Sequence, residues 1–375
     1  MAEAFSLKDH LFNADTVGYL ADLFLAADPA FPSGRFVTKA VAAFPELELK
    51  ARIAHIAEVL GDCLPAGFPA AADLIEAALP PPLDPSLTDD DFGRFIFAPL
   101  GDYVVARGLE GHFDRSMQAI EALTQRFSME FAIRPFLNRF PDRTLEVLAG
   151  WTSHPHYHVR RLVSEGTRPR LPWSGRIAVG PERTLPLLDR LFADSTRFVT
   201  RSVANHLNDI AKTDPGLAVS TVARWQAGQR QREGEMEWMA RHALRTLVKG
   251  GDAAALALLG YAGDAPIEVT RLALAGAAVP IGGALEFTLG LKAEADCRAI
   301  VDYRLDFARP NGRRGQKVFK LKSMDLQAGV PVILTKRHAL KGDATTFTLH
   351  PGLHRLAVQV NGVVLAEAAF DLTRG

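Results

Sequence analysis

The sequence predicts a mostly α-helical fold, a HEAT-like α-solenoid over residues 1–266 followed by a β-sandwich over residues 267–375. Three observations predict this fold. Apolar residues recur with helical spacing along the first two thirds of the chain, one helical segment repeats at a near-constant interval, and period-two alternation replaces both patterns after about Ile267. A chain of 375 residues exceeds one ordinary core, so more than one domain is expected.

Helical periodicity begins near residue 14 and is clear over residues 49–60 (LKARIAHIAEVL). Apolar positions there follow the i, i+3, i+4, i+7 pattern of an amphipathic helix: Ile53, Ile56, Ala57 and Leu60. Residues 79–85 (LPPPLDP) cannot continue a helix and must form a connection. The periodicity resumes at Phe113 and runs, with interruptions, to about Tyr261.

In the helical region, an aromatic residue is repeatedly followed three positions later by arginine, if His is counted as aromatic. The pairs are Phe131/Arg134, His158/Arg161, Phe198/Arg201 and Trp238/Arg241. The last three pairs are 40 residues apart and the first gap is 27, a spacing typical of stacked HEAT-like units. Equivalent positions of stacked units line one face, so the four arginines are predicted to form a row suited to a phosphate backbone. Alternatively, they pair with acids on neighbouring units, for which Glu146, Glu165 and Glu237 are available.

Short runs with period two predict the strands of the sandwich. The clearest are residues 285–289, 299–307 and 355–360, and Gly-containing turns lie between such runs, at 281–283, 310–312, 341–343, 351–352 and 361–363. No Cys…Trp…Cys pattern supports an antibody-type core. The basic loop at 309–317 (RPNGRRGQK) either contacts a second stretch of nucleic acid or is an ordinary hairpin.

The net charge of zero hides an asymmetry along the chain. Lys plus Arg against Asp plus Glu number 9 against 20 in residues 1–130, 19 against 11 in 131–250 and 15 against 12 in 251–375. A basic middle third in a neutral protein indicates a local anionic partner. The alternative is chance clustering on a solvated surface.

Several classes of protein are not indicated. The N-terminus has acids where a signal peptide has a basic start, and no apolar run approaches the roughly 20 residues of a membrane helix. Cys63 and Cys297 are far apart and form no metal or redox pair, which suits a reducing cytoplasm. His154, His156 and His158 have the wrong spacing for metal ligands on a helix face, so we expect no metal and assign this segment to the start of a helix, with one imidazole on a phosphate as a further option.

The segment 160–176 (RRLVSEGTRPRLPWSGR) is the most informative. Glu165 is expected at the C-terminal end of a helix with Gly166 as its cap, where an acid opposes the helix dipole. An extended loop stiffened by Pro169 and Pro172 follows. Its arginines and aromatic residue suit phosphates and a stacked base or sugar: Arg168, Arg170, Trp173 and Arg176. Alternatively, Trp173 fills the core between two repeats.

Three segments carry a resemblance to a known family: residues 130–136 (EFAIRPF), 164–173 (SEGTRPRLPW) and 202–210 (SVANHLNDI). They resemble the AlkC family of alkylpurine DNA glycosylases, within the AlkC/AlkD HEAT-like repeat superfamily. The resemblance covers most of the chain and is strongest between residues 113 and 260. The order of domains is also similar, with HEAT-like helices followed by an immunoglobulin-like domain.

The resemblance implies a cytoplasmic base-excision-repair enzyme that hydrolyses the N-glycosidic bond of cationic alkylated bases, such as 3-methyladenine, in duplex DNA. It implies no metal, no organic cofactor and no obligate protein partner, and it implies action without full base flipping. By similarity, Glu165 and Asp209 are the central acids, Glu130 is a third acid, and Trp173 stacks at the lesion. Carboxylates suit both stabilisation of an oxocarbenium-like sugar and positioning of water.

Other functions stay open at this point. Asp209 could instead pair with Lys212, and Glu130 could be an N-terminal helix acid. A non-catalytic HEAT scaffold that binds DNA or an acidic partner would share the basic face. It would not require Glu165 and Asp209 to converge in one cleft among the arginines. A third hypothesis is that the β-sandwich binds a partner protein.

Overall fold

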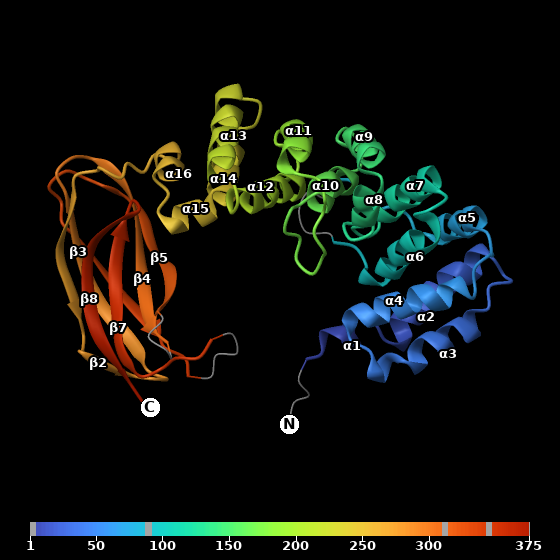
Figure 1. The fold of residues 1–375 in the computed structure, drawn as a ribbon, viewed down its shortest axis with the longest axis horizontal. Coiled ribbons are helices and arrows are strands. Elements are labelled where there is room, and N and C mark those ends of the chain that lie inside the picture. Colours follow the sequence, from blue (N-terminus) through green and yellow to red (C-terminus); the bar gives the residue numbers. More distant parts are fainter. Residues whose placement is uncertain (1–4, 87–91, 310–313, 343–346, 375) are drawn as a thin grey trace. The chain divides into compact units, whose positions relative to one another are not determined.

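The computed structural model describes residues 5–86, 92–309, 314–342 and 347–374. The chain divides into two compact units, one of residues 1–210 with 225–239 and one of residues 211–224 with 240–375. The predicted fold class is confirmed, because helices continue as far as Leu258 and strands begin at Ile267 (Figure 1). No helix in these described ranges has the length and apolar character needed to cross a membrane.

The helices have these bounds: α1 (Leu7–Leu11), α2 (Ala14–Ala27), α3 (Ser33–Ala42), η1 (Phe44–Glu46), α4 (Leu49–Gly61), α5 (Phe68–Ala78), η2 (Phe95–Phe97), α6 (Ala98–Gly108), α7 (Phe113–Thr124), α8 (Ile133–Arg139), α9 (Pro141–Trp151), α10 (Tyr157–Gly166), α11 (Pro181–Leu191), α12 (Arg197–Ala211), α13 (Pro215–Gly228), α14 (Glu233–Ala243), α15 (Arg245–Gly250) and α16 (Ala253–Leu258). The predicted helix at 49–60 is α4, and α7 starts at Phe113 as expected. Residues 79–85 form the predicted connection between helices.

Helix α10 is central to the first unit, where it packs against α7, α9 and α11. Its apolar side chains Val159, Leu162 and Val163 are fully buried, so α10 is held by packing along its length. Gly166, expected as a cap, is instead its last helical residue. A Cβ at Gly166 would lie 2.4 Å from Cγ2 of Ile133, so close packing of α8 explains the glycine.

The second unit contains a sandwich of two sheets, with strand orders β1-β3-β6 and β2-β8-β7-β4-β5. The strands are β1 (Ile267–Leu274), β2 (Ala278–Pro280), β3 (Ala284–Ala293), β4 (Cys297–Ala308), β5 (Arg314–Leu326), β6 (Val332–Ala339), β7 (Gly352–Val360) and β8 (Val363–Thr373). Residues of both sheets share one core, including Phe287 of β3, Tyr303 of β4 and Phe370 of β8. The predicted runs at 285–289, 299–307 and 355–360 lie in β3, β4 and β7.

The turn between β7 and β8 shows why the dipeptide Asn-Gly predicts a hairpin. Asn361 and Gly362 both have positive φ, +46° and +84°, and Val360 pairs with Val363 across the turn. Two-residue hairpins require this geometry, which Asn and Gly adopt most easily. In the basic segment predicted as a loop at 309–317, residues 314–317 begin β5, and residues 310–313 lie outside the described residues.

Cys63 and Cys297 are free thiols in partly buried positions. Burial raises the pKa of both thiols above the ordinary cysteine value.

Candidate functional site

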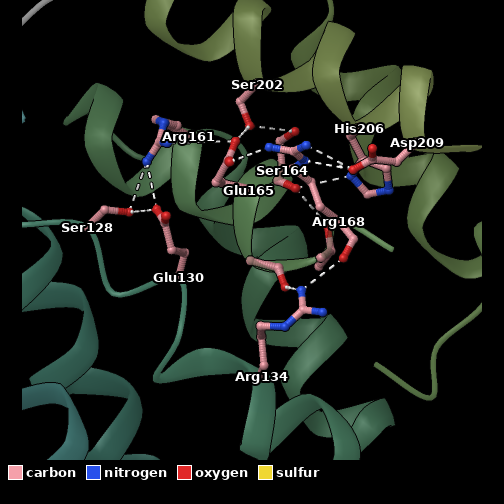
Figure 2. A network of polar contacts seen from close by, with 12 residues as sticks. Ser128, Glu130, Arg134, Arg161, Ser164, Glu165, Arg168, Ser202, His206 and Asp209 are labelled. Atoms are coloured by element: carbon pink, nitrogen blue, oxygen red, sulfur yellow. Dashed lines mark hydrogen bonds and ion pairs between the residues drawn. The ribbon is translucent and has the colours of Figure 1, made fainter. Parts of the chain in front are cut away.

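A chain of alternating charges runs through the first unit (Figure 2). Arg161 Nη1 lies 3.0 Å from Glu130 Oε2, and Arg161 Nη2 lies 3.7 Å from Glu165 Oε2. Arg168 continues the chain, with Nη1 at 2.7 Å from Glu165 Oε1 and Nη2 at 2.9 Å from Asp209 Oδ2. We call these five residues the charge chain. It brings together all three predicted acids.

Two helices and two turns position the charge chain, and Glu130 lies in the turn before α8. Arg161 and Glu165 are four residues apart on α10, so their side chains share one helix face. Arg168 follows in the turn directly after α10, and Asp209 approaches from α12. An acid at a helix C-terminus opposes the helix dipole, and Arg168 beside Glu165 offsets that cost.

Glu165 is held in its ionised form. Burial alone would raise the pKa of its carboxyl group, but the positive charges of Arg161 and Arg168 and the hydrogen bonds from Ser202 and Arg168 outweigh burial and lower the pKa. A buried carboxylate that stays charged at neutral pH is a fixed source of negative potential.

The three acids differ in access to solvent. The side chain of Glu130 is 17% exposed, whereas that of Asp209 is 2% exposed. Glu130 also accepts a 2.6 Å hydrogen bond from the Ser128 hydroxyl, which itself accepts one from Arg161. The Arg161 guanidinium lies 4.5 Å over the Phe198 ring, and this contact fixes its plane.

Glu165 and Asp209 converge on one guanidinium, and both are buried and paired. Three carboxylates and two guanidiniums leave the charge chain with one net negative charge when all are ionised. The enzyme requires the two acids to converge. Pairing of arginines with acids is the alternative to a row of arginines that contacts phosphates. Glu165 and Asp209 meet at Arg168, which is the arrangement expected of the enzyme and not required of the scaffold.

Residues of α12 that sequence reasoning missed support the acids. The Ser202 hydroxyl lies 2.6 Å from Glu165 Oε2 and 3.0 Å from Ser164 Oγ. His206 Nδ1 lies 3.0 Å from the Ser164 carbonyl oxygen, which fixes the neutral tautomer with the proton on Nδ1. Ser202 and His206 precede Asp209 by seven and three residues, so a helical-face analysis of the segment 202–210 would have found them.

His206 predicts a specific pH dependence of stability. Complete burial lowers its pKa from 6.5 to about 4. Between these values the unfolded chain binds a proton that the folded chain does not, so stability is complete above pH 6.5 and falls as the pH drops toward 4. The loss amounts to about 3 kcal/mol. We expect His206→Gln to lose less unfolding free energy over this range in denaturant titrations.

The exposed His10 supplies the matched control for this measurement. His10→Gln should keep the wild-type pH dependence. Parallel curves for wild type and His206→Gln would contradict the role assigned to the buried ring.

Trp173 lies in a tight turn at the surface. The Ser174 amide donates to the Leu171 carbonyl at 3.2 Å, and Trp173 has a φ of +63°. This position of a turn normally takes Gly or Asn, so a bulky residue here is strained. The Trp173 side chain is 62% exposed, which excludes the alternative that it fills the core, and Lys50 donates to its carbonyl oxygen.

Arg134 corrects the prediction of an arginine row. It is 3% exposed, and its guanidinium donates to the carbonyl oxygens of Gly166, Arg168 and Gly175. Arg134 therefore holds the loop after α10 and does not lie on an open face. Arg168 is likewise buried between Glu165 and Asp209.

The remaining predicted DNA contacts are more accessible. Arg170 and Arg176 are exposed on the loop that carries Trp173. Arg201 is partly buried, 5.9 Å from the centre of the Phe198 ring, and Arg241 is exposed in the second unit.

The histidine segment starts a helix, as predicted. The His156 side chain is the N-cap of α10 and accepts a hydrogen bond from the His158 amide at 3.2 Å. Within the described ranges, no cluster of three His, Cys, Asp or Glu is arranged to hold a metal ion.

Known proteins resemble both the sequence and the structure. The family described as "Uncharacterised protein YhaZ, C-terminal Ig-like domain" matches residues 268–374. The uncharacterized protein YhaZ of Bacillus subtilis (strain 168) is 34% identical over 366 residues, covering 96% of this chain and 98% of that protein. The alkylpurine DNA glycosylase AlkC of Pseudomonas fluorescens, solved bound to DNA containing an abasic site analog, is similar with a TM-score of 0.87 and 36% identity, over 98% of this chain and 100% of the other.

Proposed function

The chain belongs to the AlkC family of alkylpurine DNA glycosylases, and from this premise we propose that it hydrolyses the N-glycosidic bond of cationic alkylated bases of the 3-methyladenine type in duplex DNA. The observation that carries the proposal is the buried, ionised Glu165 at the centre of a charge chain with net negative charge.

Hydrolysis of the N-glycosidic bond of a cationic base needs little from the protein beyond a fixed negative charge. An alkylated purine with a positive ring leaves without being protonated. The C1′–N bond breaks with its electron pair remaining on the base, which becomes neutral, while the sugar becomes oxocarbenium-like. Water then adds to C1′ and gives up a proton. Negative charge fixed in advance stabilises the cationic sugar more than it stabilises the intact nucleotide, which lowers the barrier.

We assign a task to each of the three acids from how far its side chain is buried. Glu165 supplies the fixed negative charge. Glu130 is more exposed than Glu165 and Asp209, which favours it for orienting the attacking water. Asp209, the other central acid, holds the second carboxylate contact of Arg168. Trp173 stacks beside the lesion, as exposed aromatic rings do with unstacked bases.

The partner in this proposal is duplex DNA containing alkylated bases. Arg170 and Arg176 are the exposed guanidiniums nearest in sequence to Trp173, and we assign them to the phosphates that flank the lesion. Arg201 and Arg241 are further phosphate contacts in the same proposal.

Release of free 3-methyladenine from methylated duplex DNA tests the function. We expect the wild-type chain to release it in a time-dependent way, detected by chromatography of the soluble bases, with no release of unmodified adenine. Heat-denatured protein is the control. Absence of release, together with salt-dependent DNA binding, would contradict the enzyme and favour a non-catalytic scaffold.

A further inference from the structure

Phe92 is a large apolar residue exposed beside the charge chain. It is 54% exposed, and its ring packs against the Phe198 ring at 72°, with the two ring centroids 5.2 Å apart. Phe198 is only 2% exposed, and the Arg161 guanidinium lies 4.5 Å over its ring. One buried ring therefore separates the exposed ring of Phe92 from a member of the charge chain.

The backbone next to Phe92 is fixed at the same place. Gly93 forms an antiparallel bridge with Phe127, three residues before Glu130. Gly93 has a φ of +71°, and a Cβ there would lie 1.8 Å from the Arg126 carbonyl oxygen, so only glycine permits this approach. The ring contact and the backbone bridge together hold Phe92 beside the end of the charge chain that contains Glu130.

The fixed position of Phe92 distinguishes it from an ordinary exposed residue. A single exposed apolar side chain is common on protein surfaces and needs no explanation by itself. Phe92, however, is immobilised next to the acid with the most exposed side chain of the three, Glu130. A ring that is already ordered loses little conformational entropy when it packs on a flat ligand surface. A nucleobase offers such a surface to any aromatic side chain, whatever the sequence.

We propose that Phe92 contacts DNA by packing on the base next to the lesion, on the face that opens as the alkylated base leaves the stack. The inference rests on the proposed function and adds a second aromatic contact to that of Trp173. In the intact duplex the lesion covers that face. Once the C1′–N bond has broken and the base departs, the face is open to water. An apolar ring covers it, as apolar side chains do when they enter a base step. The excised base does not have to enter the protein for this contact to form.

Binding of two duplexes to the full chain tests the contact, one with an abasic-site analogue and one undamaged. Phe92→Ala should weaken binding to the abasic duplex about tenfold or more, because it loses one base–aromatic stack. Its affinity for the undamaged duplex should stay near the wild-type value, since no base face is open there. Phe92→Trp keeps an aromatic ring and should keep the affinity for the abasic duplex.

The fluorescence of 2-aminopurine placed beside the abasic-site analogue reports the stack itself. Wild type and Phe92→Trp should quench it, and Phe92→Ala should not. Phe5→Ala is the matched control, because Phe5 is 77% exposed in the same unit and outside the charge chain, and it should behave as wild type does.

A further variant keeps the test valid if Phe92→Ala misfolds. Phe92→Leu keeps an apolar side chain over the Phe198 ring but has no aromatic face. It should unfold at the wild-type temperature and quench 2-aminopurine less than wild type does.

The outcomes separate this inference from the proposed function. A Phe92→Ala protein that binds the abasic duplex as wild type does and quenches equally would overturn the contact and leave the glycosylase intact. Equal losses of affinity for both duplexes would also overturn it, because they would indicate a general effect on the binding surface. A wild-type chain that releases no 3-methyladenine, yet loses affinity for the abasic duplex alone on Phe92→Ala, would support the contact and contradict the enzyme.

Discussion

Glu165→Gln is expected to slow release of 3-methyladenine from methylated DNA by about 10²- to 10³-fold, the usual effect of removing one preorganised electrostatic group. The amide keeps the volume of the side chain and removes only the charge that the proposed mechanism uses to stabilise the developing sugar cation. Binding to DNA at matched salt should be unchanged or tighter, since one negative charge near phosphates is lost. Single-turnover release and a binding titration measure the two effects separately.

Glu146→Gln supplies the matched control, because Glu146 is exposed on α9, outside the charge chain. It should release the base at the wild-type rate. Asp209→Asn is expected to slow release in the same direction as Glu165→Gln, through its contact with Arg168. A Glu165→Gln protein that binds DNA and releases base at the wild-type rate would remove Glu165 from the mechanism.

Arg168→Met should lower the free energy of unfolding by about 3–5 kcal/mol. Arg168 is the shared partner of Glu165 and Asp209, and the methionine would leave two buried carboxylates without it. The cost arises because a buried charge without a partner retains its desolvation penalty. Denaturant titration at neutral pH measures the change.

Arg170→Met changes the same residue type two positions along the loop, where the side chain is exposed. Its free energy of unfolding should stay within about 0.5 kcal/mol of wild type. Equal losses in the two variants would show that loop charge in general, and not the pairing of the acids, sets the stability.

The fold could be predicted from periodicity because burial imposes it directly. Residues 49–60 repeat apolar side chains at helical spacing and form α4, while Asn361 and Gly362 occur where a tight hairpin needs positive φ. These signals are local, so each can be read without knowing what packs against it.

The site was predicted only in part because its contacts are long-range. Arg134 has the same spacing from a ring as Arg161, yet it lies in the first turn of the short α8 and donates to carbonyl groups at the end of α10 and in the loop after α10. Spacing alone cannot show what faces a side chain. Ser202 and His206 lie within the segment 202–210, but the sequence does not show their contacts, because their partners Glu165 and Ser164 are about 40 residues away.

Cys63 and Cys297 have a chemical consequence in a protein of this family. The thiolate is the reactive form of cysteine, and burial raises the pKa of both thiols, so at neutral pH the weakly nucleophilic thiol predominates. Methylating electrophiles that create cationic bases in DNA also attack sulfur nucleophiles. The two thiols of this chain are therefore poor targets for such electrophiles.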